Sequence, residues 1–258
     1  MRELRLRKLQ ELVRLEGSVE VESIAQLLGL SRETIRRDLA TLAGQGLVVR
    51  TRGGATAPWA SLTELDLSVR ASENHAEKEA IAKYVASAII ANGNSIALDT
   101  GTTTTEIARA LRGRPVTVVT PSLTVISELA GTTTNVIVVG GQLRHESMGT
   151  VGSIAEHVVK QFMCDVAFLC GPAINAELGL MDTDLHGVAV KQVMLAHARR
   201  TYAVLDHTKL ERTAFTRVCT SDELTGIVTD SGADPEVVRG FETAGLEVLV
   251  APMERTGQ

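Results

Sequence analysis

Hydroxyl groups, a carboxylate and a glycine are concentrated between Leu98 and Glu106, directly after the apolar run Ser95–Leu98. A glycine permits a tight turn, and hydroxyl and backbone N–H groups at the start of a following helix attract an anion. Ordinary helix capping by threonine is the simpler explanation, and no G-K-[ST] follows, which excludes a nucleotide-binding P-loop. The candidate anion-binding residues of this turn are Asp99, Gly101, Thr102, Thr103 and Thr104.

Three later segments add further candidate groups. Gly140-Gly141 and the segment Asp206–Lys209 each follow an apolar run, whereas Asp165 opens one. An ammonium at Lys209 can contact a phosphate, and a carboxylate at Asp165 can accept a hydrogen bond from a sugar hydroxyl. From its position alone, Lys209 is better explained as a surface lysine.

A second set of candidates lies near the N-terminus. Two short helical patterns are joined by Gly29-Leu30-Ser31, and these are the dimensions of a helix-turn-helix whose second helix enters the major groove of DNA. Ser31 is a good N-cap for that second helix, and Ile35, Leu39 and Leu42 give it an apolar stripe. The candidate DNA-contacting residues are Ser31, Arg32, Thr34, Arg36 and Arg37 on this helix, with Arg50 and Arg52 on a following hairpin that contains two glycines.

The charge distribution favours a polyanionic partner for the N-terminal segment alone. The 258 residues carry a formal net charge of −5, yet residues 1–57 hold ten Lys and Arg against seven Asp and Glu. A small basic segment joined to an acidic remainder is typical of a protein in which only that segment contacts nucleic acid. The alternatives are a solvated charged surface and a helix-turn-helix that binds protein instead of DNA.

Composition indicates a folded chain of one large or two smaller domains. Hydrophobic residues make up 44% and charged residues 22%, which suffices for a sizeable core. No run approaches the ~18 apolar residues of a membrane span, and the charged first residues lead into no signal segment. The three cysteines and six histidines show no metal-site spacing. We therefore expect a cytoplasmic protein with no membrane contact, no metal and no cofactor.

Helical and strand patterns alternate in the larger part of the chain, which indicates βαβ units and a mostly parallel sheet with helices on both faces. The expected helices are about 75–91, 103–111, 123–130, 153–162, 185–199 and 236–244, and the expected strands are 95–98, 116–119, 136–139, 166–169, 201–205, 226–228 and 246–250. The expected organisation is a small α+β winged helix-turn-helix over residues 1–57, a linker over 58–73, and a larger α/β domain over 74–258.

Three N-terminal segments resemble the DeoR family of bacterial transcription regulators. They are Val19–Ala25, then Leu30–Leu39 with the pattern S-x-x-T-I-R-R-D-L, and then Arg50–Ala55 with the pattern R-x-x-G-G-A. Glu20 departs from the Ser or Thr that is usual in the family, and Arg52 replaces a common His. This pair of patterns, at this separation, is highly specific.

The rest of the chain resembles the sensor domain of the same family. The matching patterns are D-x-G-T-T-T from Asp99, the glycine pair at 140–141, D-x-A-F-L from Asp165, D-x-[ST]-K from Asp206, and Arg70 with Lys78 at the start of the domain. The resemblance makes Lys209 a candidate effector contact. Pro121 and His186-Gly187 depart from the family pattern, so the effector can differ accordingly.

The resemblance implies an N-terminal winged helix-turn-helix that binds double-stranded operator DNA. It also implies that residues 74–258 are a phosphosugar-sensing effector domain, similar to ribose-5-phosphate isomerase, whose ligand is a phosphorylated sugar. The expected function is therefore repression of sugar or carbohydrate catabolic genes, relieved by that ligand. The expected assembly is a homodimer or homotetramer.

A phosphosugar isomerase with a fused DNA-binding head is the alternative function. Isomerisation needs a general base that moves a proton between adjacent carbons. Related isomerases carry an Asp three positions after the residue matched by Asp165, where this chain has Phe168. An apolar ring cannot transfer a proton. We therefore predict binding without turnover, and no catalytic residue.

Overall fold

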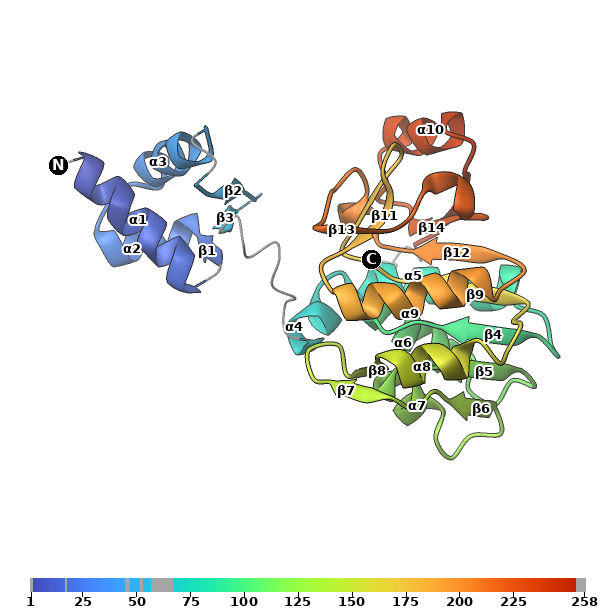
Figure 1. The fold of residues 1–258 in the computed structure, drawn as a ribbon. Coiled ribbons are helices and arrows are strands. Elements are labelled where there is room, and N and C mark those ends of the chain that lie inside the picture. Colours follow the sequence, from blue (N-terminus) through green and yellow to red (C-terminus); the bar gives the residue numbers. More distant parts are fainter. Residues whose placement is uncertain (1, 17, 45–46, 52, 57–66, 254–258) are drawn as a thin grey trace, which may run out of the picture. The chain divides into compact units, whose positions relative to one another are not determined.

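The computed structural model describes residues 2–16, 18–44, 47–51, 53–56 and 67–253. The chain divides into two compact units, Met1–Glu64 and Leu65–Gln258 (Figure 1). Among the described residues, no helix is both long and apolar enough to cross a membrane. The described part of the expected linker 58–73 contains helix α4, Leu67–Ser72, which belongs to the second unit.

The N-terminal unit combines three helices with a three-stranded antiparallel sheet in the order β1-β3-β2. Its elements are α1 (Arg2–Glu16), β1 (Ser18–Glu20), α2 (Val21–Leu28), α3 (Arg32–Gly44), β2 (Val49–Arg50) and β3 (Gly54–Thr56). The apolar stripes of the helices meet in one core, in which Leu9, Ile35 and Leu39 are fully buried. This confirms the predicted small α+β domain with a winged helix-turn-helix.

The turn between α2 and α3 depends on local chemistry that the sequence makes visible. Gly29 has a left-handed backbone (φ 64°), which costs a glycine little, and its N–H and that of Leu30 bond to carbonyls of α2. The Ser31 hydroxyl accepts a hydrogen bond from the Thr34 N–H at 3.2 Å. Ser31 is therefore the N-cap of α3, as predicted.

The C-terminal unit is built on a seven-stranded sheet in which every neighbouring pair is parallel. The strand order is β15-β14-β12-β9-β4-β5-β6. The strands are β4 (Ser95–Leu98), β5 (Thr117–Thr120), β6 (Asn135–Val138), β9 (Val166–Leu169), β12 (Thr201–Val204), β14 (Gly226–Asp230) and β15 (Glu247–Ala251). The expected parallel α/β sheet is confirmed.

Helices cover both faces of this sheet because its strands are apolar on both sides (Figure 1). Ile96 and Leu98 of β4 belong to a core with α5, α6 and α7, whereas Ala97 belongs to a core with α8, α9 and α10. The helices are α5 (His75–Tyr84), continued by the π-helical turn η2 (Val85–Ile89), α6 (Thr102–Ala110), α7 (Leu123–Leu129), α8 (Ser153–Val159), α9 (Leu185–Ala196) and α10 (Pro235–Thr243).

Two smaller antiparallel elements were not expected from the sequence. One is a hairpin and the other is a sheet in the order β10-β11-β13. These strands have three or four residues and are not continuous apolar runs like those of the main sheet, so neither alternation nor apolar content marks them in the sequence. They are β7 (Gln142–Arg144), β8 (Gly149–Val151), β10 (Ala173–Asn175), β11 (Gly179–Asp182) and β13 (Thr216–Cys219), accompanied by the 3-10 turns η3 (His207–Lys209) and η4 (Ser221–Glu223).

Candidate DNA-binding surface and anion site

Helix α3 is basic on the face that points away from the core. Ile35 and Leu39 are fully buried, whereas Arg32, Arg36 and Arg37 are exposed. A helix that enters the major groove needs this division, because its apolar stripe anchors it to the domain while its polar side chains contact the nucleic acid. The predicted contact residues on α3 therefore lie on a surface that can meet DNA.

Two of these arginines interact with carboxylates of the same unit. Arg32 pairs with Glu22 of α2, and Nε of Arg37 lies 3.6 Å from a carboxylate oxygen of Glu33. All four side chains are largely exposed, and exposed ion pairs contribute only about 0–1 kcal/mol. DNA phosphates can therefore replace these carboxylates at little cost.

The hairpin arginine Arg50 contacts the recognition helix directly. Its Nη1 donates a hydrogen bond to the carbonyl oxygen of Arg36 at 3.0 Å. The structure thus brings Arg50 next to α3, as a wing that extends the same basic surface requires. Arg52, the other hairpin candidate, lies outside the described residues.

Asp38 has a structural role that was not anticipated from the sequence. Its carboxylate is 2% exposed and accepts hydrogen bonds from Arg5 of α1 at 2.5 and 3.2 Å. This two-point contact fixes the orientation of α3 against α1. The available signal was position, because Asp38 follows Ile35 by three residues and therefore lies on the apolar stripe.

The two hairpin glycines differ in what surrounds them. A Cβ on Gly54 would lie 1.8 Å from the carbonyl oxygen of Val19 in β1, whereas a Cβ on Gly53 would meet nothing within 4 Å. Gly54 is therefore required for the close passage of β3 against β1. This packing is sufficient to explain a glycine at position 54.

Replacing Gly54 with alanine is expected to destabilise the N-terminal unit by about 1–3 kcal/mol, because β1 and β3 must separate to admit the methyl group. The matched substitution Gly53→Ala is expected to change the stability by less than about 0.5 kcal/mol. Native-state hydrogen exchange of the amides in residues 5–56 measures both effects. Equal exchange in the two variants would contradict this explanation of Gly54.

In the second unit, the strand order changes direction between β4 and β9. The chain passes from β4 outward through β5 and β6 and then returns to β9 on the other side of β4. Parallel α/β sheets bind ligands at such a point, beyond the carboxyl ends of the strands. Asp99 follows β4 and Cys170 follows β9, and the Cys170 N–H donates to Oδ2 of Asp99 at 3.0 Å.

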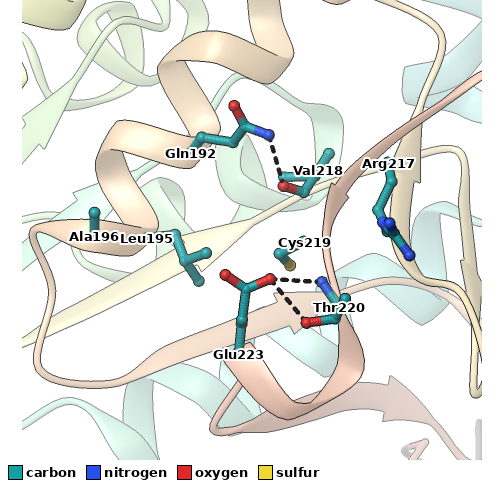
Figure 2. Close-up of a pocket in the computed structure, with 8 residues that line it drawn as sticks. All are labelled: Gln192, Leu195, Ala196, Arg217, Val218, Cys219, Thr220 and Glu223. Atoms are coloured by element: carbon teal, nitrogen blue, oxygen red, sulfur yellow. Dashed lines mark hydrogen bonds between the residues drawn. The ribbon is translucent and has the colours of Figure 1, made fainter.

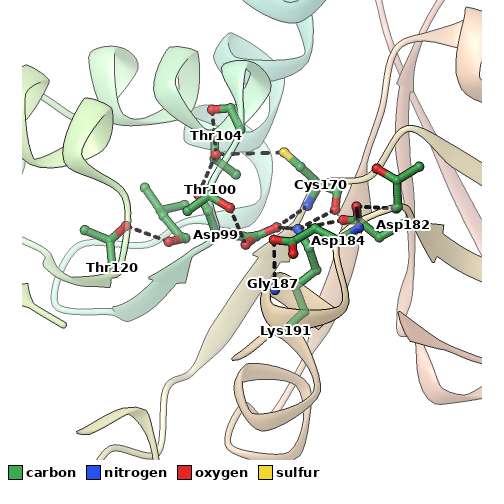
Figure 3. Close-up of polar contacts among 12 residues, drawn as sticks. Asp99, Thr100, Thr104, Thr120, Cys170, Asp182, Asp184, Gly187 and Lys191 are labelled. Carbon is green, nitrogen blue, oxygen red and sulfur yellow. Dashed lines mark hydrogen bonds and ion pairs between the residues drawn. The ribbon is translucent and has the colours of Figure 1, made fainter. Parts of the chain in front are cut away.

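Lys191 of α9 brings a buried cation to this edge (Figure 3). Its ammonium donates to the Asp99 carboxylate and, at 2.9 Å, to the Cys170 carbonyl, and it lies 3.4 Å from the carboxylate of Asp182 at the end of β11. Burial disfavours the ammonium, but the charges of Asp99 and Asp182 outweigh burial and raise the pKa of Lys191 above its ordinary value. Lys191 therefore stays charged, and it connects α9 to the ends of β4, β9 and β11.

The start of α9 is fixed by Asp184. Its carboxylate accepts hydrogen bonds from the N–H groups of His186 and Gly187 at 3.1 and 2.9 Å, and it lies 3.3 Å from Nε of Arg144. A Cβ on Gly187 would lie 2.6 Å from the same carboxylate. The departure from the family pattern at His186-Gly187 thus fits the local capping geometry.

The N-terminus of α6 also lies at this edge. Gly101 precedes the helix, and a Cβ there would lie 2.7 Å from Sγ of Cys170, so only glycine fits. The Thr104 hydroxyl turns back and donates to the carbonyls of Asp99 and Gly101 at 2.7 and 3.0 Å. Among the described residues, no side chain caps α6, which leaves its first N–H groups, including those of Thr102 and Thr103, suited to an anion.

A second charged cluster follows β12, the neighbour of β9. Asp206 is fully buried, and its Oδ1 accepts hydrogen bonds from the side chains of Asn74 and Thr208 at 3.0 and 2.5 Å. Its Oδ2 lies 3.6 Å from Nζ of Lys209 and has no hydrogen-bond partner within the described part of the chain. Burial disfavours the carboxylate, but the charges of Lys209 and Lys78 help to lower the pKa of Asp206.

Lys78 of α5 completes this cluster. Its side chain is 2% exposed, and its ammonium donates to the carbonyls of Arg70 and, at 2.5 Å, Glu73. Burial, reinforced by the charge of Lys209, lowers the pKa of Lys78. The strands β4, β9 and β12 are neighbours in the sheet, so the groups that follow them lie side by side at its carboxyl edge. The groups beyond β4, β9 and β12 therefore form one charged edge.

Two family models match the chain, one in each unit. The DeoR-like helix-turn-helix domain matches residues 5–59, and the DeoR C terminal sensor domain matches residues 73–231. The chain belongs to the DeoR family. A helix-turn-helix joined to a sensor domain is the organisation of a DNA-binding regulator, which confirms the prediction that this DeoR-family chain is not an enzyme.

Named relatives match over most of the chain. It is 32% identical over 223 residues to the glycerol-3-phosphate regulon repressor of Escherichia coli (strain K12), covering 86% of this chain and 88% of that protein. It is 32% identical to the putative aga operon transcriptional repressor of Escherichia coli O157:H7, covering 92% and 90%. It is 28% identical to the uncharacterized HTH-type transcriptional regulator YulB of Bacillus subtilis (strain 168), covering 98% of each.

Solved structures share part of the α/β fold. Ribose 5 phosphate isomerase A from Neisseria gonorrhoeae is 14% identical, with a TM-score of 0.38 over 51% of this chain and 52% of that chain. The Pyrococcus horikoshii translation initiation factor eIF-2B is 15% identical, with a TM-score of 0.44 over 59% and 62%. Likeness at this level carries no conclusion about the activity or ligand of the DeoR-family chain.

The sensor unit of this DeoR-family chain separates one predicted effector residue from the others. Asp165 precedes β9, so it lies at the amino edge of the sheet, where its carboxylate accepts hydrogen bonds from the N–H and hydroxyl of Ser95 at 2.9 and 2.8 Å. Asp99 and Cys170 lie at the opposite, carboxyl edge, roughly 13 Å away at about 3.3 Å per strand residue. The placement of Asp165 among the effector contacts is therefore corrected.

The glycine pair after β6 is farther along the carboxyl edge, two strands from β4. A Cβ on Gly141 would lie 2.7 Å from the carbonyl oxygen of Val151 in β8, whereas one on Gly140 would meet nothing within 4 Å. Gly141 therefore has a packing role in the β7–β8 hairpin. The same packing argument does not apply to Gly140.

A separate cavity lies between α9 and β13 (Figure 2). Nε2 of Gln192 donates to the carbonyl oxygen of Val218 at 3.1 Å, and the Glu223 carboxylate accepts from the N–H and hydroxyl of Thr220 at 2.8 Å. None of the predicted effector residues is in this cavity, whose lining residues are Gln192, Leu195, Ala196, Arg217, Val218, Cys219, Thr220 and Glu223.

Proposed function

We propose that this protein represses genes of sugar or carbohydrate catabolism and releases its operator when a phosphorylated sugar binds at the carboxyl edge of the second unit. Two relatives support this by name, as repressors of an aga operon and of a glycerol-3-phosphate regulon. The sugar phosphate can act only if its affinity differs between the DNA-bound and the released arrangement.

The observation that carries the effector proposal is the cluster of Lys78, Lys209 and Asp206. Two ammonium groups accompany one carboxylate, which leaves excess positive charge in a largely buried place and so favours a phosphate. The open Oδ2 of Asp206 is suited to accept a hydrogen bond from a sugar hydroxyl. The N–H groups at the start of α6 supply further donors.

The proposed operator surface is α3 with the hairpin that follows it. Its proposed contacts are Ser31, Arg32, Thr34, Arg36, Arg37 and Arg50, together with Arg52 from the sequence. A homodimer would present two such surfaces and a homotetramer four, so that either could bind repeated half-sites, as helix-turn-helix regulators require. The anion contacts proposed in the second unit are Asp99, Gly101, Thr102, Thr103, Thr104, Gly140, Gly141 and Lys209, with Lys78 and Asp206 added by the structure.

Two measurements on the full chain test this function. In a thermal-shift screen, glycerol 3-phosphate and other sugar phosphates are compared with their dephosphorylated forms, and only a phosphorylated member should stabilise the protein. A duplex selected from random sequences should bind with a log–log salt slope near −0.9 per neutralised phosphate and dissociate when that member is added. No binding of duplexes at low salt, or equal stabilisation by unphosphorylated sugars, would refute the proposal.

Replacing Lys209 with alanine is expected to weaken binding of the sugar phosphate selected in that screen by about 1.5–3 kcal/mol, because a charge-assisted hydrogen bond to the phosphate is lost. Titration calorimetry measures the loss. Lys160→Ala, which removes an exposed lysine after α8, is the matched control and should leave the affinity unchanged. The same affinity in both variants would exclude Lys209 from the site.

A further inference from the structure

Helix α4 is held by the charged cluster that we propose as the anion site. It is the first described element of the second unit, and residues 57–66 precede it in the chain after β3. The ammonium of Lys78 donates to the carbonyl of Arg70 within α4 and, at 2.5 Å, to the carbonyl of Glu73 just after it. One buried cation therefore holds the end of α4.

The turn between α4 and α5 is attached to the same cluster by a second contact. The side-chain amide of Asn74 donates to Oδ1 of Asp206 at 3.0 Å and to the Thr208 hydroxyl at 3.1 Å. Asn74 has a left-handed backbone (φ 49°), which is uncommon for residues other than glycine. This contact joins residues 132 positions apart in the chain and fixes the turn before α5 to the segment after β12.

A third contact joins α4 to the β7–β8 hairpin. Nη2 of Arg70 donates to the carbonyl oxygen of Glu146 at 2.9 Å. Replacing this side chain therefore offers a way to loosen α4 while the residues Lys78, Lys209 and Asp206 are kept.

We propose that α4 reports whether the anion site is occupied, because the phosphate and the carbonyls of α4 compete for the ammonium of Lys78. The carbonyls of Arg70 and Glu73 use two of the three N–H donors of the Lys78 ammonium, so a phosphate that accepts from more than one of them must displace a carbonyl. A charged phosphate is the stronger acceptor. A phosphate bound between Lys78 and Lys209 therefore draws the ammonium away from Arg70 and Glu73 and releases α4. This inference rests on the proposed function, and it names the element through which the site acts on the segment leading to the DNA-binding unit.

The test compares hydrogen exchange of the full chain with and without saturating inorganic phosphate, while titration calorimetry measures phosphate binding to the same protein. The amides of residues 67–74 should exchange about 5–150-fold faster with phosphate, the range of typical allosteric coupling. The amides of residues 102–104 should exchange more slowly, because they lie at the open start of α6 and donate to the anion. These opposite signs distinguish release of α4 from general stabilisation by a ligand.

Arg70→Met is the decisive variant. It should raise exchange of residues 67–74 in the absence of phosphate, and, because coupling is reciprocal, it should also raise the affinity for phosphate. The control is Ser72→Ala, which removes only a hydrogen bond from the Ser72 hydroxyl to the Val69 carbonyl within α4, and it should bind phosphate like the unaltered protein.

The outcomes separate this inference from the proposed function. If phosphate binds but exchange of residues 67–74 is unchanged or slower, or if Arg70→Met does not change the phosphate affinity, the role of α4 is overturned and the anion site stands. If neither phosphate nor any sugar phosphate binds, the proposed effector site is overturned, and the role of α4 with it.

Discussion

Replacing Lys191 with methionine is expected to lower the free energy of unfolding of the C-terminal unit by about 3–5 kcal/mol, the usual result of removing one partner of a buried ion pair. The ammonium lies between the carboxylates of Asp99 and Asp182, and its side chain is 4% exposed. Without it, both carboxylates remain in the interior with no cation between them. Urea unfolding measures the loss of stability, with hydrogen exchange of the amides in β4, β9 and α9 as the signal that is monitored.

The pH dependence of the Lys191→Met variant gives this prediction a second measurement. Burial raises the pKa of the Asp99 carboxyl group, and Lys191 opposes this rise. With the ammonium gone, only hydrogen bonds such as that from the Cys170 N–H still oppose it, so the pKa rises further. A carboxyl group whose pKa is raised by folding costs stability at neutral pH, and this cost disappears as the pH falls and the group is protonated. The destabilisation should therefore be largest near neutral pH and smaller in acid.

Lys160→Met is the control for this experiment, because Lys160 is exposed after α8 and its loss should cost less than about 0.5 kcal/mol. A loss for Lys191→Met no larger than for this control would show that the buried pair does not hold β4, β11 and α9 together.

The double replacement of Arg36 and Arg37 by alanine is expected to weaken binding to the selected operator duplex by about 1–3 kcal/mol for each side chain that contacts a base in bidentate fashion. Both side chains are exposed on α3, next to the buried anchor Ile35. Fluorescence anisotropy with the operator and with an unrelated duplex separates base contacts from phosphate contacts, because only base contacts distinguish the two sequences.

The matched control removes two exposed arginines of the second unit, Arg212 and Arg239, and should leave operator affinity unchanged. Hydrogen exchange verifies that the N-terminal unit of the Arg36/Arg37 variant is still folded. Unchanged operator affinity in that variant would show that α3 is not the recognition helix.

The N-terminal unit was predictable from the sequence because its structure depends on neighbours in the chain. The N-cap at Ser31, the left-handed turn at Gly29 and the apolar stripe from Ile35 to Leu42 act over a few residues. Asp38 is the exception, since its partner Arg5 lies 33 residues away, and a charge on the apolar stripe shows only that some partner must exist.

The candidate anion site was predictable only in part. The turn from Asp99 to Thr104 stood out because it follows an apolar run, whereas Lys209 became a candidate only through the resemblance to the DeoR family. The roles of three further residues, Lys78, Asp206 and Lys191, depend on partners from other helices and strands. In Asp206, one buried carboxylate oxygen also has no hydrogen-bond partner among the described residues. Spacing along the chain contains no sign of these contacts.

The amino-acid sequence by itself determined the helix-turn-helix, the N-cap of α3 and the alternating pattern that produces a parallel sheet, because capping, turn formation and apolar periodicity operate between residues close in the chain. Only the tertiary structure decided that Lys191 lies between Asp99 and Asp182, and that Asp165 lies at the other edge of the sheet. Strand order and strand direction bring distant charges together or keep them apart, and both are set by how the whole chain packs.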